Sequence, residues 1–196
     1  MPLAYIALGS NLPSPAGPPE ATLAAAVQRL ASLGRIAARS SLYSTAPVGL
    51  PPGLVDQPRF LNAVLALETD LAPRNLLTAL LSIESDFGRD RAASVPNGPR
   101  TLDLDILLYG DLILSEPGLE IPHPRLAQRA FVLVPLNEIA PDLRDPRSGS
   151  TVSQLLLNLP GCPILGASLS HAPRVGTDEP LAQSVAPIQS PLWPVE

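Results

Sequence analysis

The sequence contains no lysine, and all 13 of its basic residues are arginine. Without lysine the chain cannot use a Walker-type P-loop, a Schiff base or a lysine general base. If the protein handles phosphate groups, arginine side chains and a bound cation must neutralise their charge. The formal net charge of −5 also argues against a protein that coats nucleic acid.

Cysteine is nearly absent as well. Cys162 is alone, which excludes an intrachain disulfide framework and fits a reducing compartment. Residues 1–11 lack the basic start and the long apolar run of a signal peptide, and no run of about 18 apolar residues could cross a membrane. We therefore expect a cytoplasmic protein without a membrane partner.

Hydrophobic residues make up 45% of the chain, enough for a packed core, whereas aromatic residues make up only 4%. The periodic pattern fades beyond about residue 149, and residues 163–196 are rich in proline with few charges. We predict one domain over residues 1–148. Residues 149–196 are predicted to form a short helix near 155–157 followed by a flexible, proline-rich tail.

Apolar spacing and turn residues define the elements of the first domain. The predicted order is strand 3–8, a helix over 23–30 closed by Gly34, strand 36–45, strand 60–69, a helix from Pro73 to near Gly88, strand 101–109 and a helical stretch over 132–139. Residues 46–58 and 88–100 read as loops rich in proline and glycine. This order predicts an α+β protein with a ferredoxin-like βαββαβ core, a mostly antiparallel sheet and flanking helices.

Two acidic residues interrupt the strand predicted at 101–109. Asp103 and Asp105 share one face of it, because residues two apart on a strand point the same way, and the leucines between and around them point to the other face. Two neighbouring carboxylates repel unless a cation neutralises them, and oxygen ligands suit Mg²⁺. The alternative is a solvated strand face with two acids that bind nothing.

Three arginines flank this strand through one loop: Arg89, Arg91 and Arg100. They could form plain surface ion pairs, which contribute little. They could instead grip a triphosphate that the metal also holds, a role that suits the planar guanidinium fork. Both readings stay open at this point.

A second group of residues suits a flat heterocycle. Asn62 interrupts an otherwise apolar strand and needs hydrogen-bond partners, either from the backbone or from the amide-like edge of a ring. Phe60 and Phe131 could be core residues or the walls of a ring pocket. His123 lies between two prolines, so that its side chain is held in place, and the turn at Gly9-Ser10-Asn11 could bind phosphate or simply turn.

Five motifs occur in a characteristic order. They are Tyr5-Ile6-Ala7-Leu8-Gly9-Ser10-Asn11-Leu12, Asp56-Gln57-Pro58-Arg59-Phe60-Leu61-Asn62-Ala63, Gly98-Pro99-Arg100-Thr101-Leu102-Asp103-Leu104-Asp105-Ile106, Ile121-Pro122-His123-Pro124-Arg125 and Arg129-Ala130-Phe131-Val132-Leu133-Val134-Pro135-Leu136. Together they resemble the 6-hydroxymethyl-7,8-dihydropterin pyrophosphokinases of folate biosynthesis, over roughly residues 3–145.

The resemblance implies an enzyme that transfers pyrophosphate from ATP to the hydroxymethyl group of the pterin and releases AMP. It implies two Mg²⁺ ions on Asp103 and Asp105, with Arg89 and Arg100 serving the transfer. The pterin pocket then comprises Thr45, Pro47, Val48, Phe60, Asn62 and Phe131. The ATP site comprises Glu84, Arg89, Arg91, Arg100, His123 and Arg129. We expect a monomer acting on these two small molecules, with no nucleic-acid partner and no evident general base.

The sequence departs from the family pattern in three places. Residues 92–97 lack the aromatic and the extra basic residue that many relatives carry, Gly118 replaces a frequent basic contact to ATP, and the loop after Thr45 is longer. A catalytically silent pterin- or nucleotide-binding module of the same fold is therefore the main alternative. A nucleotidyltransferase also pairs Gly-Ser with two acids, but here several predicted elements separate Ser10 from Asp103.

Overall fold

In the computed structural model, the described residues are 1–47, 57–91, 97–160 and 185–193. The elements in chain order are β1 (Leu3–Ser10), α1 (Pro19–Leu30), β2 (Arg35–Arg39), β3 (Leu42–Thr45), β4 (Phe60–Glu68), α2 (Pro73–Asp86), β5 (Asp103–Tyr109), β6 (Leu114–Glu116), β7 (Leu119–Ile121), the 3₁₀ turn η1 (Leu126–Gln128), α3 (Ala130–Ile139), α4 (Val152–Leu157) and β8 (Val185–Ile188). Val48, one of the predicted pterin contacts, lies outside the described residues.

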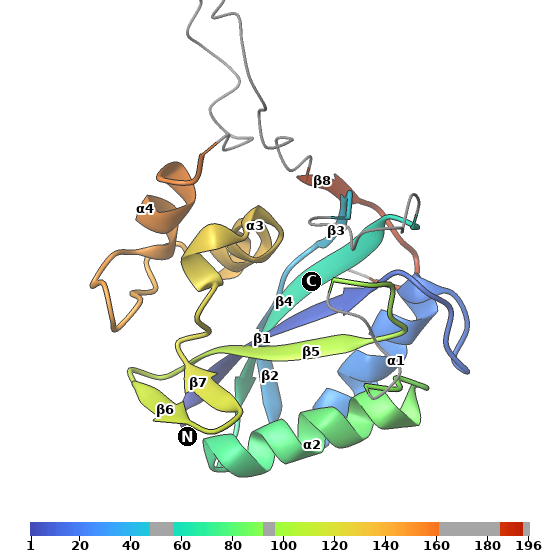
Figure 1. Ribbon diagram of the computed structural model, residues 1–196, viewed down its shortest axis with the longest axis horizontal. Helices are drawn as coiled ribbons and strands as arrows, with labels where there is room; N and C mark the ends of the chain where they lie inside the picture. Colours follow the sequence, from blue (N-terminus) through green and yellow to red (C-terminus); the bar gives the residue numbers. More distant parts are fainter. Residues whose placement is uncertain (48–56, 92–96, 161–184, 194–196) are drawn as a thin grey trace, which may run out of the picture.

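The main sheet has the order β5-β1-β4-β3-β8, and β2 also pairs with β4 (Figure 1). Every pairing in it is antiparallel, with β1 between β4 and β5. Apart from the single strand predicted at 36–45, the predicted strands and helices are present, and the ferredoxin-like arrangement of an α+β protein is confirmed. A separate pair, β6 and β7, was not anticipated from the sequence.

The strand predicted at 36–45 is split into β2 and β3 at Ser40 and Ser41. Ser40 is fully buried there, and its backbone N–H donates to the Val64 carbonyl at 2.9 Å. Its hydroxyl also accepts the Val64 N–H at 3.0 Å, so that a side chain replaces a backbone partner. The ladder with β4 is thus interrupted without leaving a buried polar group unpaired.

The sheet is covered on both faces, which makes three layers. α1 and α2 pack on one face through residues such as Leu23, Leu30, Leu76 and Leu80. α3 covers the other face, and α4 packs against α3, as Figure 1 shows. The strands β1, β4 and β5 therefore read as nearly continuous apolar runs, because both of their faces face helices.

α2 begins at Pro73 as the sequence predicts, whereas α1 begins at Pro19, four residues before the predicted start; a proline lies in the first turn of each helix. Gly34, however, does not cap α1, which ends four residues earlier at Leu30. A Cβ atom on Gly34 would lie 2.1 Å from the Glu68 carbonyl oxygen. This glycine is therefore required by a close approach of two backbones.

The C-terminal region corrects one expectation. The predicted short helix is present as α4, but residues 185–193 do not form a flexible tail: β8 pairs with β3, and the Trp193 side chain is only 3% exposed. A four-residue strand containing Pro187 gives no periodic signal, and proline is tolerated only at a sheet edge such as this one.

No helix among the described residues is both long and apolar enough to span a bilayer. The domain division at residue 148 stays a prediction.

Candidate active site

A cavity of about 500 Å³ lies on the α3 side of the sheet, where β1, β4 and β5 meet the loop before β5. Eleven of the predicted site residues line it: Thr45, Phe60, Asn62, Arg89, Arg91, Arg100, Asp103, Asp105, His123, Arg129 and Phe131. These residues come from segments far apart in the sequence. The sheet register and α3 bring them together.

Asp103 and Asp105 both face this cavity from β5. Leu102, Leu104 and Ile106 point into the core on the α1 and α2 side, each at most 5% exposed. The alternation predicted from the sequence is thus confirmed. The cavity also distinguishes the pair from two acids on an open, solvated face.

Gly9 of β1 lies between the two halves of the cavity. It is opposite Asp103 in one ladder and opposite Asn62 in the other. A Cβ atom at this position would lie 3.3 Å from Asn62 Oδ1 and 3.7 Å from Asp103 Cβ. A side chain here would crowd the amide against the carboxylate, so that glycine leaves room for a ligand to reach both.

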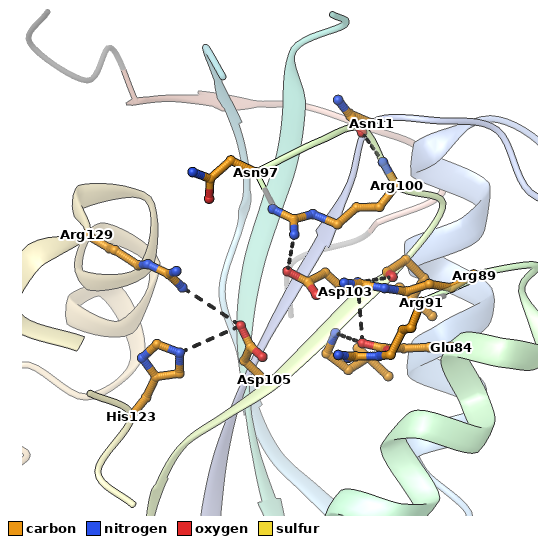
Figure 2. A network of polar contacts seen from close by, with 12 residues as sticks. Asn11, Glu84, Arg89, Arg91, Asn97, Arg100, Asp103, Asp105, His123 and Arg129 are labelled. Atoms are coloured by element: carbon orange, nitrogen blue, oxygen red, sulfur yellow. Dashed lines mark hydrogen bonds and ion pairs between the residues drawn. The ribbon is translucent and has the colours of Figure 1, made fainter. Parts of the chain in front are cut away.

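Two arginines converge on Asp103, as Figure 2 shows. The Arg89 guanidinium donates to the Leu102 carbonyl at 2.6 Å and forms an ion pair with Asp103. Arg100 Nη1 lies 3.3 Å from Asp103 Oδ2. The Nε atoms of both arginines are buried without a hydrogen-bond partner among the described residues. Donors of this kind suit an anion, because buried N–H groups need acceptors.

Glu84 lies beneath this group and does not line the cavity. Its side chain is 1% exposed. It accepts hydrogen bonds from Arg91 Nε and from the Leu104 N–H, both at 2.8 Å, and lies 3.5 Å from Arg89. Burial raises the pKa of Glu84, while these hydrogen bonds and arginines act to lower it. The carboxylate therefore anchors two arginines and the start of β5, rather than facing a ligand as the sequence had suggested.

Asp105 faces a second basic group. Arg129 Nη1 lies 3.8 Å and His123 Nε2 4.0 Å from Asp105 Oδ2 (Figure 2). Burial raises the pKa of Asp105, and the neighbouring Asp103 raises it further. A carboxylate in this situation gains from any additional cation in the cavity.

His123 is held in its uncharged form. Burial, followed by Arg129 and Arg125, lowers its pKa to about 4. Its Nδ1 accepts the backbone N–H of Arg125 at 3.0 Å, which leaves the ring proton on Nε2. The Nε2–H group therefore points toward Asp105 and the cavity as a neutral donor.

The remaining part of the cavity is suited to a flat ring. Asn62 Nδ2 donates to Thr45 Oγ1 at 2.8 Å, and both side chains are buried. Phe60 and Phe131 supply aromatic surface, with Arg100 5.1 Å from the Phe60 ring centroid and Arg129 5.4 Å from that of Phe131. The Asn62 carbonyl oxygen has no hydrogen-bond partner among the described residues, so it is available to a ligand.

Some lining residues were missed from the sequence, and Pro47, like Glu84, falls outside the cavity. Ala46, Asn97, Arg125 and Gln128 line it as well. Arg125 and Gln128 belong to the stretch between His123 and Arg129, where their spacing could have indicated them. Pro47 is half-buried next to Ala46 and is not a lining residue.

Ser10 and Asn11 hold the cavity together from outside it. Ser10 Oγ donates to the Thr101 carbonyl at 2.6 Å. Asn11 Oδ1 accepts the Arg100 N–H at 2.8 Å, and its Nδ2 donates to the Pro58 carbonyl at 3.0 Å. Among the described residues, this turn is hydrogen-bonded to the segments that carry Arg100 and Phe60. Its polar side chains therefore bond to the protein backbone rather than facing the cavity.

The sequence matches the model of the 7,8-dihydro-6-hydroxymethylpterin-pyrophosphokinase (HPPK) family over residues 5–141. It is 48% identical to a 2-amino-4-hydroxy-6-hydroxymethyldihydropteridine pyrophosphokinase of Pseudomonas aeruginosa over 162 residues, 83% of this chain and 93% of that one. A Methylorubrum extorquens protein of the same name is 45% identical over 161 residues, 81% of this chain and 94% of the relative.

Solved structures agree on the fold. Wild-type Plasmodium falciparum HPPK-DHPS superposes with a TM-score of 0.59 at 15% identity, covering 79% of this chain. The chain spans only 44% of that longer protein. On the family match and the bacterial relatives together, the chain belongs to the 7,8-dihydro-6-hydroxymethylpterin-pyrophosphokinase family.

Proposed function

We propose that this protein transfers the pyrophosphoryl group of ATP to the hydroxymethyl oxygen of 6-hydroxymethyl-7,8-dihydropterin, releasing AMP, in folate biosynthesis. One observation carries the proposal. A single cavity holds two carboxylates with converging arginines beside an amide and two phenyl rings. A polyphosphate and a flat heterocycle can therefore bind next to each other in it.

The pterin is assigned to the half around Asn62. Its amide presents a carbonyl oxygen to the ring's amide-like edge, while Phe60 and Phe131 provide aromatic surface. Thr45 fixes the Asn62 side chain. A site that hydrogen-bonds a heterocycle in this way discriminates strongly against analogues without the matching groups.

ATP is assigned to the basic half. Arg89, Arg91 and Arg100 approach from one side of the carboxylates, and His123 and Arg129 approach from the other. Phosphoryl transfer needs orientation and charge neutralisation more than covalent help, and guanidinium forks provide both. The neutral His123 adds a hydrogen-bond donor without repelling the arginines.

Asp103 and Asp105 are the proposed ligands of magnesium. The described residues contain no group of three or more acidic, histidine or cysteine side chains that would form an all-protein cage. Two carboxylates fit Mg²⁺ nonetheless, because this ion keeps several waters and takes further ligands from substrate phosphates. When bound, it would neutralise phosphate charge and polarise the transferred group. Two ions and a cytoplasmic, monomeric enzyme stay predictions.

The test is product analysis of the purified chain with ATP, Mg²⁺ and the reduced pterin. The proposal predicts AMP and the pterin diphosphate. ADP with a pterin monophosphate, or a nucleotide attached to the acceptor, would contradict it. Binding of both substrates without any product would favour the catalytically silent module.

A further inference from the structure

Residues 185–193, here called the C-terminal segment, lie beyond residue 141, where the family match ends. They nevertheless belong to the sheet that carries the site. The segment consists of β8 and the turn that follows it, and β8 runs antiparallel along β3 (Figure 1). It adds a strand at an edge that would otherwise be open.

Thr45 lies at the centre of this arrangement. In the sheet it is opposite Phe60 of β4 on one side and opposite Val185 of β8 on the other. Its hydroxyl accepts the hydrogen bond from Asn62. β3 spans only four residues and would be an edge strand without β8, with one row of backbone groups unpaired. β8 therefore restrains the backbone that holds Thr45.

Trp193 anchors the far end of the segment. Its indole N–H donates to the Ser40 carbonyl at 2.8 Å, at the break between β2 and β3. The Arg39 guanidinium lies 4.5 Å from the ring centroid, and the ring is packed in the core under the sheet. The segment is thus hydrogen-bonded to Ser40, just before β3 begins, and it pairs with β3 along its length.

β8 also contacts α3, the helix that carries Phe131. Val185 packs against the hydrophobic cluster formed by α3 and α4, and so does Phe131. Ile188 packs against the cluster on the opposite face. Anchored on both faces of the sheet, the segment braces the two elements that carry Thr45 and Phe131.

We propose that the C-terminal segment is a positioning element of the heterocycle site: by holding β3 it fixes Thr45, and through Thr45 it fixes the Asn62 amide. This inference rests on the proposed function, because it takes Asn62 and Thr45 as pterin-binding residues. The segment acts indirectly, since none of its residues lines the cavity.

The test measures steady-state kinetics of full-length Trp193→Ala and Trp193→Phe. Trp193→Ala removes both the hydrogen bond and the ring packing of the anchor, and it is expected to raise KM for the pterin about tenfold and KM for ATP less than about twofold. Trp193→Phe keeps an aromatic ring in the core and loses the indole donor, so a smaller rise of about threefold in the pterin KM is expected. Leu192→Ala is the matched control, because Leu192 is adjacent and 50% exposed.

A pterin-selective rise in either tryptophan variant supports the inference. Equal rises in both KM values, or no change in either, overturn it. If circular dichroism shows Trp193→Ala to be unfolded, Trp193→Phe decides by the same criteria. Wild-type turnover and Asn62→Ala are measured beside them. Failure of the wild type to use the pterin, or equal loss of both substrates in Asn62→Ala, would count against the proposed function and not against the segment's role.

Discussion

At the scale of single residues, the basic half of the cavity depends on Glu84. This buried carboxylate accepts from Arg91 and from the backbone of β5, and it lies within ion-pair distance of Arg89. Removing one partner of a buried charge cluster leaves the others uncompensated. Glu84 therefore has a larger effect on the site than its position outside the cavity suggests.

Replacing Glu84 by Gln should lower kcat about 100-fold, because misplacing the arginines by about an ångström costs that much. The pterin KM should change little, since the Asn62 half is separate. Steady-state kinetics measures both values. Asp86→Asn is the control: it removes the same charge from the same helix, but its partner Arg29 is exposed. Wild-type kcat in Glu84→Gln would show that the arginines are held by other contacts.

His123 makes the stability of the ligand-free protein depend on pH. Its pKa falls from 6.5 to about 4 on folding, mainly through burial. Between these values the unfolded chain binds a proton that the folded chain does not. The contribution of His123 to the free energy of unfolding is therefore complete above pH 6.5 and is lost as the pH falls toward 4.

Urea unfolding at several pH values in this window checks the sign. The stability difference between the wild type and His123→Gln should shrink or reverse as the pH falls from 6.5 to 4. An NMR titration of the His123 ring should give a pKa of about 4. A titration near 6.5 would mean that the ring is not held neutral by its surroundings.

At the scale of elements, the turn after β1 joins two loops that carry site residues. Asn11 is 2% exposed and bonds to both the Arg100 and the Pro58 backbone. Each such hydrogen bond contributes roughly 1 kcal/mol, and leaving buried partners unpaired adds to the loss. Asn11 is therefore a structural tie between the ATP half and the heterocycle half.

Asn11→Ala is expected to lower the free energy of unfolding by about 2 kcal/mol. It should also raise the KM of both substrates, because both loops lose their anchor. Denaturant unfolding and kinetics measure the two effects. Asn75→Ala, the same change at an exposed position of α2, should leave both unchanged. A loss below about 0.5 kcal/mol in Asn11→Ala would be typical of an ordinary surface site.

Strands and helices could be predicted where their sequence carries a local signal, and not where they depend on distant contacts. β1, β4, β5 and α2 were predictable because long apolar runs and a leading proline are local signals. The break at Ser40 was not, since it depends on a hydroxyl meeting Val64 across the sheet. β8 was missed because its pairing with β3 joins residues far apart in sequence, and Pro187 weakens its local pattern.

The candidate site was predictable to a similar degree. The alternation of Asp103 and Asp105 with apolar residues predicted that both acids face the same side of the strand. The order of the motifs, through the family resemblance, assigned the arginines and Asn62 to the same site. Burial of Glu84 could not be read from the sequence, because an acid on an amphipathic helix usually faces solvent. Its burial depends on Arg89 and Arg91 returning over α2 from the next loop.

At the scale of the whole molecule, charge is distributed unevenly. The chain is acidic overall, with 18 acidic and 13 basic residues. Arg89, Arg91, Arg100, Arg125 and Arg129 nevertheless all line one cavity. A local basic site in an acidic protein attracts a small polyanion without favouring nucleic acid. The three-layered fold places this site on one side of the sheet.

Asp103 and Asp105 are proposed to act together as the magnesium site of this cavity. The most direct measurement is the rate of AMP release from ATP and the reduced pterin by Asp103→Asn and Asp105→Asn, with circular dichroism to confirm folding. Each variant should stay folded and lose turnover at any magnesium concentration. Turnover near the wild-type rate in either folded variant would contradict the proposal.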